Sequence, residues 1–253
     1  MTPPKRMAGG PGQLQEDADL ETSSEEYATR FAGPVGRWFL EVQARSTLEL
    51  LRGLPPGSSI LDVGGGHGQI APALLGAGYR ATILGSAGAC GAHLPARMNG
   101  AGYRFEVGDL RALPYPDRAF AAVTCFRLLP HSVNWHHLVG ELCRVADLAV
   151  VADYPSTRSL NQFANRFFTF KQKVERNTRP FELINPGEIE SEFSRRGFRV
   201  TAERPQFLLP MVLYRMAGSD RLARIAERPG RWLGLTRHFG SPVIVRADRR
   251  QSA

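Results

Sequence analysis

The chain has 253 residues, of which 43% are hydrophobic and 22% are charged, a composition typical of a globular protein with one domain of ordinary size. No apolar run approaches the roughly 20 residues that span a membrane. The polar N-terminus lacks the apolar core of a signal peptide, so we expect a cytoplasmic protein. The three cysteines have no metal-ligand spacing, which favours reduced thiols and no metal site.

The formal net charge of +8 is unevenly distributed along the chain. Residues 1–154 carry 13 basic and 15 acidic side chains, whereas residues 155–253 carry 19 basic and 9 acidic ones. This asymmetry indicates either a solvated arginine-rich surface or a basic face for an anionic substrate, a nucleic acid or a membrane surface.

The first predicted elements are a disordered segment and two helices. Residues 1–24 are polar and rich in glycine, proline and acidic side chains, which is typical of disorder. Over residues 27–54, apolar side chains recur at three- and four-residue steps, as on a helix with one buried face. Gly33 and Pro34 interrupt that pattern, so we expect two cap helices within residues 25–57.

Short apolar runs then alternate with helical stretches over residues 58–154. The pattern predicts strands at residues 60–63, 81–84, 103–107, 119–126 and 148–153, with helices beginning near residues 69, 88 and 135. Such alternation predicts an α/β fold: a doubly wound, mostly parallel, Rossmann-like sheet with helices on both faces and right-handed crossovers.

The pattern changes after Pro155. We predict helices at residues 157–176, 186–197 and 219–230, and strands at residues 198–209 and 241–249. The proline inside the first of these strands places it at a sheet edge or breaks it. Residues 155–253 would complete a single domain, residues 25–253, with a substrate-binding half and an acceptor-site lid.

The stretch ILDVGGGHGQ, residues 60–69, leads from the first predicted strand into a helix through a glycine-rich turn. Such a turn lets the backbone approach a ligand at the helix N-terminus. A phosphate-binding loop would need Gly-Lys-Ser/Thr, and a dinucleotide loop would need glycine where this chain has Gln69. The remaining pattern is Asp-x-Gly-x-Gly-x-Gly, formed by Asp62, Gly64, Gly66 and Gly68.

This stretch resembles motif I of the class I S-adenosylmethionine-dependent methyltransferases. Two further stretches, FEVGDLRALPYPDRAFAAVTCF and LLPHSVNWHHLVGELCRV, are similar in order and spacing to the small-molecule, type 11-like branch of that superfamily. The resemblance covers roughly residues 58–154. It implies a seven-stranded methyltransferase sheet, S-adenosylmethionine as cofactor and methyl transfer as the reaction.

Carried over position by position, the resemblance implies these cofactor-binding residues: Asp62, Gly64, Gly66, Gly68, Ser86, Asp109, Leu110, Phe126 and Arg127. The glycines would border the methionine part of the cofactor, with the aspartate of the first strand behind them. Asp109 would accept a hydrogen bond from the adenine amino group, and the backbone N–H of Leu110 would face the adenine ring. Phe126 and Arg127, after the fourth predicted strand, would lie beneath the sulfonium.

One departure from the family pattern concerns the second strand, which in the family ends in an acid that holds both ribose hydroxyls. Here it ends in LGSA, residues 84–87, and no acidic residue occurs between Asp62 and Glu106. Ser86 would supply one hydroxyl contact. Loss of a charged hydrogen bond predicts an affinity about 10- to 100-fold lower, and it also fits a relative that has lost turnover.

Methyl transfer from a sulfonium requires alignment of the acceptor with the methyl group, and a base only where the acceptor must lose a proton. His131, after the fourth strand, is the first candidate for a catalytic base; the alternative is a capping or packing histidine. Asp153 and Tyr154, at the end of the fifth strand, are the second candidates. His67, in the glycine turn, would touch the cofactor or close the acceptor site.

The acceptor pocket is expected above the carboxyl ends of the strands. Its walls would come from Tyr27, Phe31 and Trp38 of the N-terminal helices and from the aromatic residues of the helix at residues 157–176. This lining favours an apolar or aromatic small-molecule acceptor. The apolar stretch PQFLLPMVLYRM, beside an arginine-rich surface, is also compatible with peripheral membrane contact.

Three functions compete at this stage. The leading one is an S-adenosylmethionine-dependent methyltransferase acting on O, C or N of a small-molecule or lipid-like acceptor. A nucleic-acid methylase is favoured only by the basic C-terminal part, because RLLPH stands where an Asn/Asp-Pro-Pro-aromatic motif would follow the fourth strand. A non-catalytic binding protein with the methyltransferase fold is favoured by the missing ribose acid.

Overall fold

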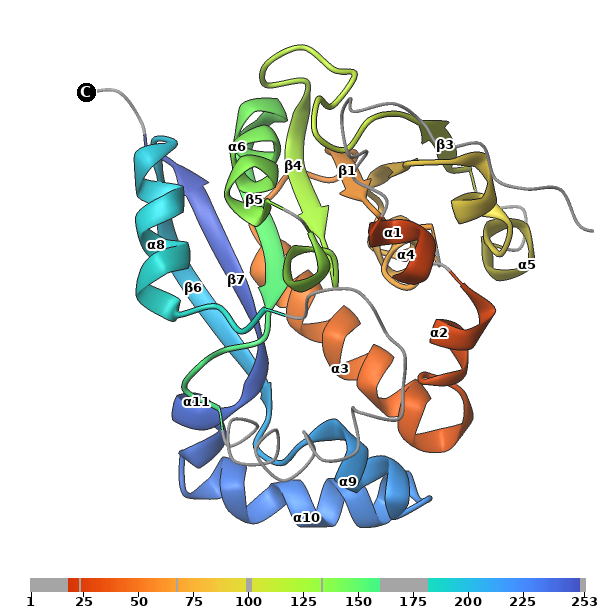
Figure 1. Ribbon diagram of the computed structural model, residues 1–253, viewed down its shortest axis with the longest axis vertical. Coiled ribbons are helices and arrows are strands. Elements are labelled where there is room, and N and C mark those ends of the chain that lie inside the picture. The colour runs from red at the N-terminus through yellow and green to blue at the C-terminus, as the bar shows by residue number, and fades with distance from the viewer. Residues whose placement is uncertain are drawn as a thin grey trace, which may run out of the picture.

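A computed structural model describes residues 18–22, 24–66, 68–98, 102–132, 134–159 and 182–250 of the protein. Its strands form one seven-stranded sheet in the order β3-β2-β1-β4-β5-β7-β6 (Figure 1). Strands β1 to β5 run parallel, whereas β7 is antiparallel to both β5 and β6. The strands are β1 (Ser59–Val63), β2 (Arg80–Gly85), β3 (Arg104–Val107), β4 (Phe120–Cys125), β5 (Ala146–Tyr154), β6 (Phe198–Phe207) and β7 (Ser241–Arg249).

The described helices connect and cover these strands. They are α1 (Ala18–Thr22), α2 (Glu25–Thr29), α3 (Gly33–Leu51), α4 (Ala71–Gly76), α5 (Leu94–Met98), α6 (Trp135–Val145), α8 (Pro186–Arg195), α9 (Met211–Met216), α10 (Asp220–Trp232) and α11 (Leu235–Phe239). Two short 3-10 helices, η1 (Gly88–Gly91) and η2 (Leu129–His131), follow β2 and β4. The predicted doubly wound, mostly parallel sheet is therefore confirmed.

The core lies on both faces of the sheet, because alternate residues of each strand point to opposite sides. Leu61 packs on one face with side chains of α6 and α8, whereas Ile60 packs on the other with side chains of α3 and α4. Both are fully buried. Each such side chain contributes roughly 1.5–3 kcal/mol of hydrophobic stabilisation, which fixes the positions of the strand ends that carry the site.

The predicted break between the N-terminal helices is confirmed at the start of α3. Gly33 has a φ of +72°, and Pro34 follows it in the first turn, where no backbone N–H is required. The chain then packs so tightly that a Cβ at Gly36 would lie 2.2 Å from the carbonyl carbon of Phe31. These residues therefore set the angle at which α3 leaves α2.

The C-terminal part follows the predicted order of elements. Asn185 caps α8 by accepting a hydrogen bond from Gly187 N at 2.8 Å, and β6, the strand that contains Pro205, is an edge strand as predicted. Helix α10 extends to Trp232, beyond the predicted end. Pro229 lies inside α10 on an exposed side, so the proline does not end the helix as the sequence pattern predicted.

The prediction of disorder over residues 1–24 is wrong for its last part, because residues 18–22 form α1 and Ser24 caps α2. Residues 1–17 lie outside the described residues, as do His67 and residues 160–181, which hold most of the predicted helix at residues 157–176. The acceptor-site lid therefore stays a prediction. None of the helices in the described segments has the length and apolar character needed to traverse a bilayer.

Candidate cofactor and acceptor site

The glycine turn after β1 is built around the carboxylate of Asp62. This side chain is 1% exposed, and its Oδ1 accepts a hydrogen bond from the Thr124 hydroxyl at 2.8 Å. Oδ2 is buried without a hydrogen-bond partner among the described residues. Burial raises the pKa of Asp62 to about 7, against the opposing effect of the hydrogen bond from Thr124.

The turn needs glycine because its backbone folds over that carboxylate. A Cβ at Gly65 would lie 1.9 Å from Asp62 Oδ2, so any side chain there would displace the acid. Gly64, with a φ of +74°, donates its N–H to Leu84 O at 2.8 Å, and Gly68 donates to Gly65 O at 2.7 Å. The predicted motif residues of this turn are thus brought together as a bare backbone surface over an acid.

At the end of β2, where the family pattern has an acidic residue, an acidic side chain from another element is present. A Cβ at Gly85 would lie 2.8 Å from Cys90 Cβ, so the strand end has no room for an acidic side chain. Instead, Asp19 of α1 enters from the N-terminal segment. Its Oδ2 accepts hydrogen bonds from Ser86 N at 2.6 Å and from Cys90 Sγ at 3.3 Å. A carboxylate is therefore present beside Ser86, but it comes from α1 and not from the strand.

Sequence reasoning missed Asp19 because the polar composition of residues 1–24 was interpreted as disorder. Asp19 is fully buried, and Ala18 beside it packs in the same cluster as Leu84 and Leu110. The one local signal was Ser24, whose hydroxyl accepts from Tyr27 N at 3.2 Å and marks a helix start. That signal predicts α2 but not the burial of the residues before it.

The predicted adenine residues follow β3. Asp109 accepts hydrogen bonds from Arg111, at 2.9 Å from the backbone N–H and at 3.1 Å from the guanidinium, and these bonds lower its pKa. Leu110 is fully buried, in the cluster that includes Ala18. Both residues lie just beyond the end of β3, and Leu110 shares its buried cluster with Ala18 of α1; their contact with adenine stays a prediction.

The volume of the cavity beside the glycine turn bears on whether the cofactor fits there. A cavity bordered by Asp62, Gly64, Phe126 and Arg127 has a volume of about 20 Å³. Ligand sites commonly enclose roughly 300–1,000 Å³. The bare glycine turn and the unpartnered oxygen of Asp62 suit the amino-acid end of S-adenosylmethionine, whereas Asp19 of α1 lies against the turn after β2, where the resemblance places the ribose.

Arg127, at the end of β4, separates this small cavity from a larger one. Its φ is +59°, a left-handed conformation that strains a residue with a side chain. Its backbone N–H donates to Asp153 Oδ1 at 2.5 Å, and its guanidinium donates to the side chains of Gln43 and Gln69. The same guanidinium lies 3.8 Å from the centre of the Phe31 ring. Four partners therefore hold Arg127 in this conformation.

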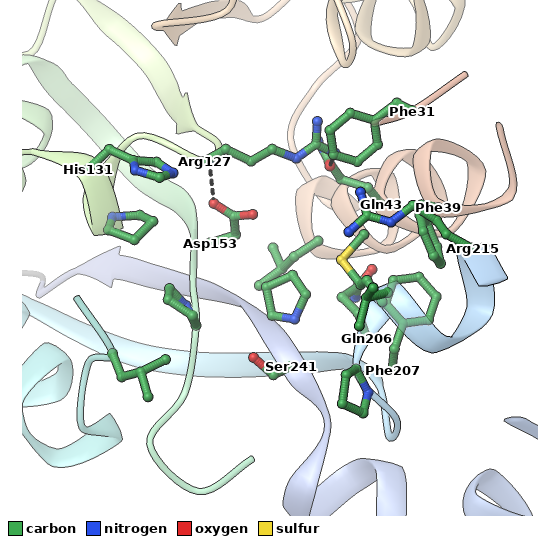
Figure 2. A pocket seen from close by; sticks show the side chains of 18 of the residues that line it. Phe31, Phe39, Gln43, Arg127, His131, Asp153, Gln206, Phe207, Arg215 and Ser241 are labelled. Carbon is green, nitrogen blue, oxygen red and sulfur yellow. Dashed lines mark hydrogen bonds between the residues drawn. The ribbon is translucent and has the colours of Figure 1, made fainter. Parts of the chain in front are cut away.

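The larger cavity has a volume of about 380 Å³ and a mostly apolar lining (Figure 2). Phe31 comes from the turn between α2 and α3, Phe39 from α3, Phe207 from the end of β6, and Met211 from α9. The predicted wall residues Tyr27 and Phe31 do line it. Trp38 does not, because it is 3% exposed and packs behind the wall against Tyr214.

The polar groups of this cavity are few and are contributed by separate elements. They are Gln43, Arg127, His131, Asp153, Gln206, Arg215 and Ser241 (Figure 2). The structure thus brings together the first and second candidates for a base, one on η2 and the other near the end of β5. Burial raises the pKa of Asp153 to about 6, while the hydrogen bond from Arg127 N acts in the opposite direction.

Tyr154, the other candidate on β5, does not face the cavity. Its side chain is 1% exposed, and its hydroxyl donates to Glu203 Oε1 at 3.2 Å. This candidate is therefore a core residue, because adjacent residues of a strand point to opposite faces of the sheet. The described residues contain no group of three or more histidine, cysteine or acidic side chains arranged to hold a metal ion.

Comparisons with known proteins agree with this geometry. Residues 60–147 match a family model described as a methyltransferase domain. A comparison with curated protein sequences finds no significant match. Many solved structures resemble the fold at low sequence identity, and three illustrate its range.

Magnesium protoporphyrin IX methyltransferase from Synechocystis PCC 6803, with bound S-adenosylhomocysteine, has a TM-score of 0.65 at 14% identity, covering 93% of this chain and 98% of the other. An S-adenosylmethionine-dependent methyltransferase of Thermotoga maritima, titled a possible histamine N-methyltransferase, has a TM-score of 0.61 at 14% identity, with coverages of 93% and 100%. The [4+2]-cyclase SpnF has a TM-score of 0.56 at 18% identity, with coverages of 83% and 81%.

The chain therefore has the class I S-adenosylmethionine-dependent methyltransferase fold, and residues 60–147 are similar to a methyltransferase domain. The resemblance drawn from the three sequence stretches is confirmed. S-adenosylmethionine is the cofactor of this family of domains.

Proposed function

We propose that the protein is an S-adenosylmethionine-dependent methyltransferase that acts on a small, largely apolar or aromatic acceptor. The observation that carries this proposal is the pairing of two spaces at the carboxyl ends of the parallel strands. The glycine turn over Asp62 suits the methyl donor, and the 380 Å³ apolar cavity suits an acceptor. Arg127 borders both spaces, so donor and acceptor would meet beside it.

The residues near the donor have separable roles. Asp62, Gly64 and Gly66 would hold the amino-acid end of S-adenosylmethionine, and Phe126 and Arg127 would lie near its sulfur. The cofactor supplies a methyl group already activated by the positive sulfonium. The chain's main contribution is then alignment, since an in-line displacement depends on the distance and angle between acceptor atom and methyl group.

Proton removal from the acceptor would be the task of Asp153 or His131, which both line the cavity. With a pKa of about 6, Asp153 is ionised at neutral pH and is a stronger base than an ordinary carboxylate. Its hydrogen bond from Arg127 N fixes its orientation. We propose Asp153, in addition to His131, as a candidate for the catalytic base. An acceptor whose methylated atom does not lose a proton would need neither residue.

We also propose a cytoplasmic location. Cys90, Cys125 and Cys143 are buried and form no disulfide, which suits a reducing compartment.

One observation favours a second function, that of a binding protein which has kept the fold without methyl transfer. The cleft at the end of β2 holds α1 where the cofactor's ribose would lie. The [4+2]-cyclase with the same fold shows that the fold also occurs in proteins named for other reactions.

The test is transfer of a labelled methyl group from S-adenosylmethionine to a panel of apolar and aromatic alcohols, amines and carboxylic acids. We expect labelled product with the wild-type protein and none with Gly65→Ala, in which Asp62 is displaced. Gly76→Ala is the matched control, because nothing lies within 4 Å of a Cβ at that position. Tight binding of S-adenosylhomocysteine without turnover on any acceptor would favour the binding protein.

A further inference from the structure

The position of α1 in the cofactor cleft has a regulatory consequence. Ala18 and Asp19 are both fully buried, and α1 packs against η1 after β2. The Cβ of Asp19 lies 3.6 Å from the position that a Cβ at Gly64 would take. Asp19 therefore lies between the turn after β1 and the turn after β2, in the space that the proposed function assigns to the cofactor's ribose.

The burial of Asp19 is only partly compensated. Oδ2 has two donors, the N–H of Ser86 and the thiol of Cys90. Oδ1 is buried and has no hydrogen-bond partner among the described residues. A buried carboxylate oxygen without a donor is costly, so the cleft holds α1 less firmly than a fully satisfied contact would.

We propose that α1 is an autoinhibitory segment. Asp19 accepts the hydrogen bond from the Ser86 backbone N–H and lies where the ribose would bind, so cofactor binding requires α1 to leave. This inference rests on the proposed function. The cavity beside the glycine turn, which Thr22 of α1 also lines, has a volume of about 20 Å³, well below that of an ordinary ligand site. Any factor that draws residues 18–22 out of the cleft would then raise the cofactor affinity.

The experiment compares the full-length wild type with Asp19→Ala and with Leu20→Ala. Leu20 is on the same helix but is 37% exposed, so its replacement is the matched control. Titration calorimetry gives the Kd of S-adenosylhomocysteine, and amide hydrogen exchange follows residues 18–22 with and without the ligand. We expect Asp19→Ala to bind about 10-fold more tightly or better, Leu20→Ala to bind like the wild type, and residues 18–22 to exchange faster when the ligand is bound.

The opposite result is equally informative. Weaker or unchanged binding by Asp19→Ala, with residues 18–22 still protected in the complex, would overturn the proposal. Weaker binding in particular would make Asp19 a ribose ligand supplied from α1. Failure of the folded wild type and of Asp19→Ala to bind at all would instead refute the proposed function.

A second surface carries an independent inference. Eight of the eleven large apolar side chains that are exposed in the described part of the chain lie within residues 213–239. On α10, Leu222, Ile225 and Trp232 are 56%, 58% and 85% exposed. They are separated by three and seven residues and so share one helix face with Pro229. Helix α10 therefore presents an apolar stripe outward, while the buried Ala223 and Glu227 form its inward face.

Basic side chains flank this stripe. Arg221, Arg228 and Arg237 are exposed and make no ion pair with any described residue. At 3.6 residues per turn, Arg221 and Arg228 lie beside the apolar stripe and away from the buried face. An outward apolar stripe with an aromatic residue and flanking arginines is the pattern of a helix that lies in the headgroup region of a membrane.

Helix α9 links this end of the molecule to the acceptor cavity. Met211 and Arg215 of α9 line the cavity, whereas Leu213 and Met216 of the same helix are exposed. In Figure 1, α9, α10 and α11 lie together at one end of the molecule. A membrane against this end would lie next to a helix that lines the cavity proposed for an apolar acceptor.

We infer that helices α9 to α11 form a docking surface for an anionic lipid bilayer. The probe is a set of phosphatidylcholine vesicles with and without phosphatidylglycerol, at low and high salt. Trp232 reports insertion directly, because Trp38 and Trp135 are each 3% exposed. We expect a blue shift of its emission and co-sedimentation only with the anionic vesicles, both weakened by salt.

Two variants and a control test the surface. Arg228→Ala should weaken vesicle binding about 5-fold, the effect of one basic charge near an anionic bilayer. Leu222→Ser should also weaken it, whereas Val107→Ser, at a position on β3 that is 54% exposed, should not. Absence of binding to anionic vesicles would overturn the inference. A shift of Trp232 emission that depends on protein concentration without vesicles would also overturn it, since the face would then join copies of the chain.

Discussion

The buried acid at the end of β5 makes the stability of the protein depend on pH in a defined direction. Burial raises the pKa of Asp153 from its ordinary 3.8 to about 6. The folded protein therefore binds this proton more tightly than the unfolded chain does. The associated stabilisation is present in full below about pH 4, is lost as the pH rises through 6, and amounts to about 3 kcal/mol.

Asp153→Asn removes this ionisation while its amide oxygen still accepts from Arg127 N. We expect the free energy of unfolding of the wild type, measured by urea at several pH values, to fall by about 3 kcal/mol more between pH 4 and pH 8 than that of the variant. Asp62, whose pKa is raised to about 7, causes a similar fall in both proteins and cancels in the comparison. Parallel pH curves for wild type and variant would refute the reasoning.

Three further substitutions test other contacts. Gly65→Ala should weaken S-adenosylhomocysteine binding at least 10-fold in calorimetry, because its Cβ would overlap Asp62 Oδ2, whereas Gly76→Ala should bind normally. Arg118→Gly should raise the free energy of unfolding by about 0.5–1 kcal/mol in urea, since the exposed arginine has a φ of +57°; a decrease would contradict the assigned strain. Glu227→Gln should lower it by about 2 kcal/mol, because this 1% exposed carboxylate accepts from two hydroxyls and a backbone amide; an unchanged unfolding midpoint would exclude that role.

The sheet could be predicted from the sequence because its signals are local. Most of the first five strands are short apolar runs, and the glycines at positions 64–68 mark the turn at which a ligand would bind. The positions of His131 and Asp153 on one cavity also followed from topology. His131 follows β4 and Asp153 lies at the end of β5, and the carboxyl ends of these parallel strands meet at one edge of the sheet.

The replacement of the missing acid could not be predicted, because it depends on a contact between residues far apart in the chain. Asp19 reaches Ser86 across 67 positions, and the composition around it is that of a disordered segment. The environment of Tyr154 also depends on packing, since the side that a strand residue faces is fixed only by the register with its neighbours. The sequence pattern around Trp38 is compatible with a cavity wall and with the core. Its ring contacts with Phe207 and Tyr214 place it in the core.

The most direct test of the account is a calorimetric titration of S-adenosylhomocysteine into the full-length protein, Asp19→Ala and Gly66→Arg, with folding of each checked by thermal unfolding. Gly66 is buried in the turn, so an arginine there would fill the space that the cofactor's amino-acid end needs. The account predicts micromolar binding by the wild type or by Asp19→Ala, and no binding by Gly66→Arg. Absence of binding by both of the first two proteins, or full binding by Gly66→Arg, would contradict it.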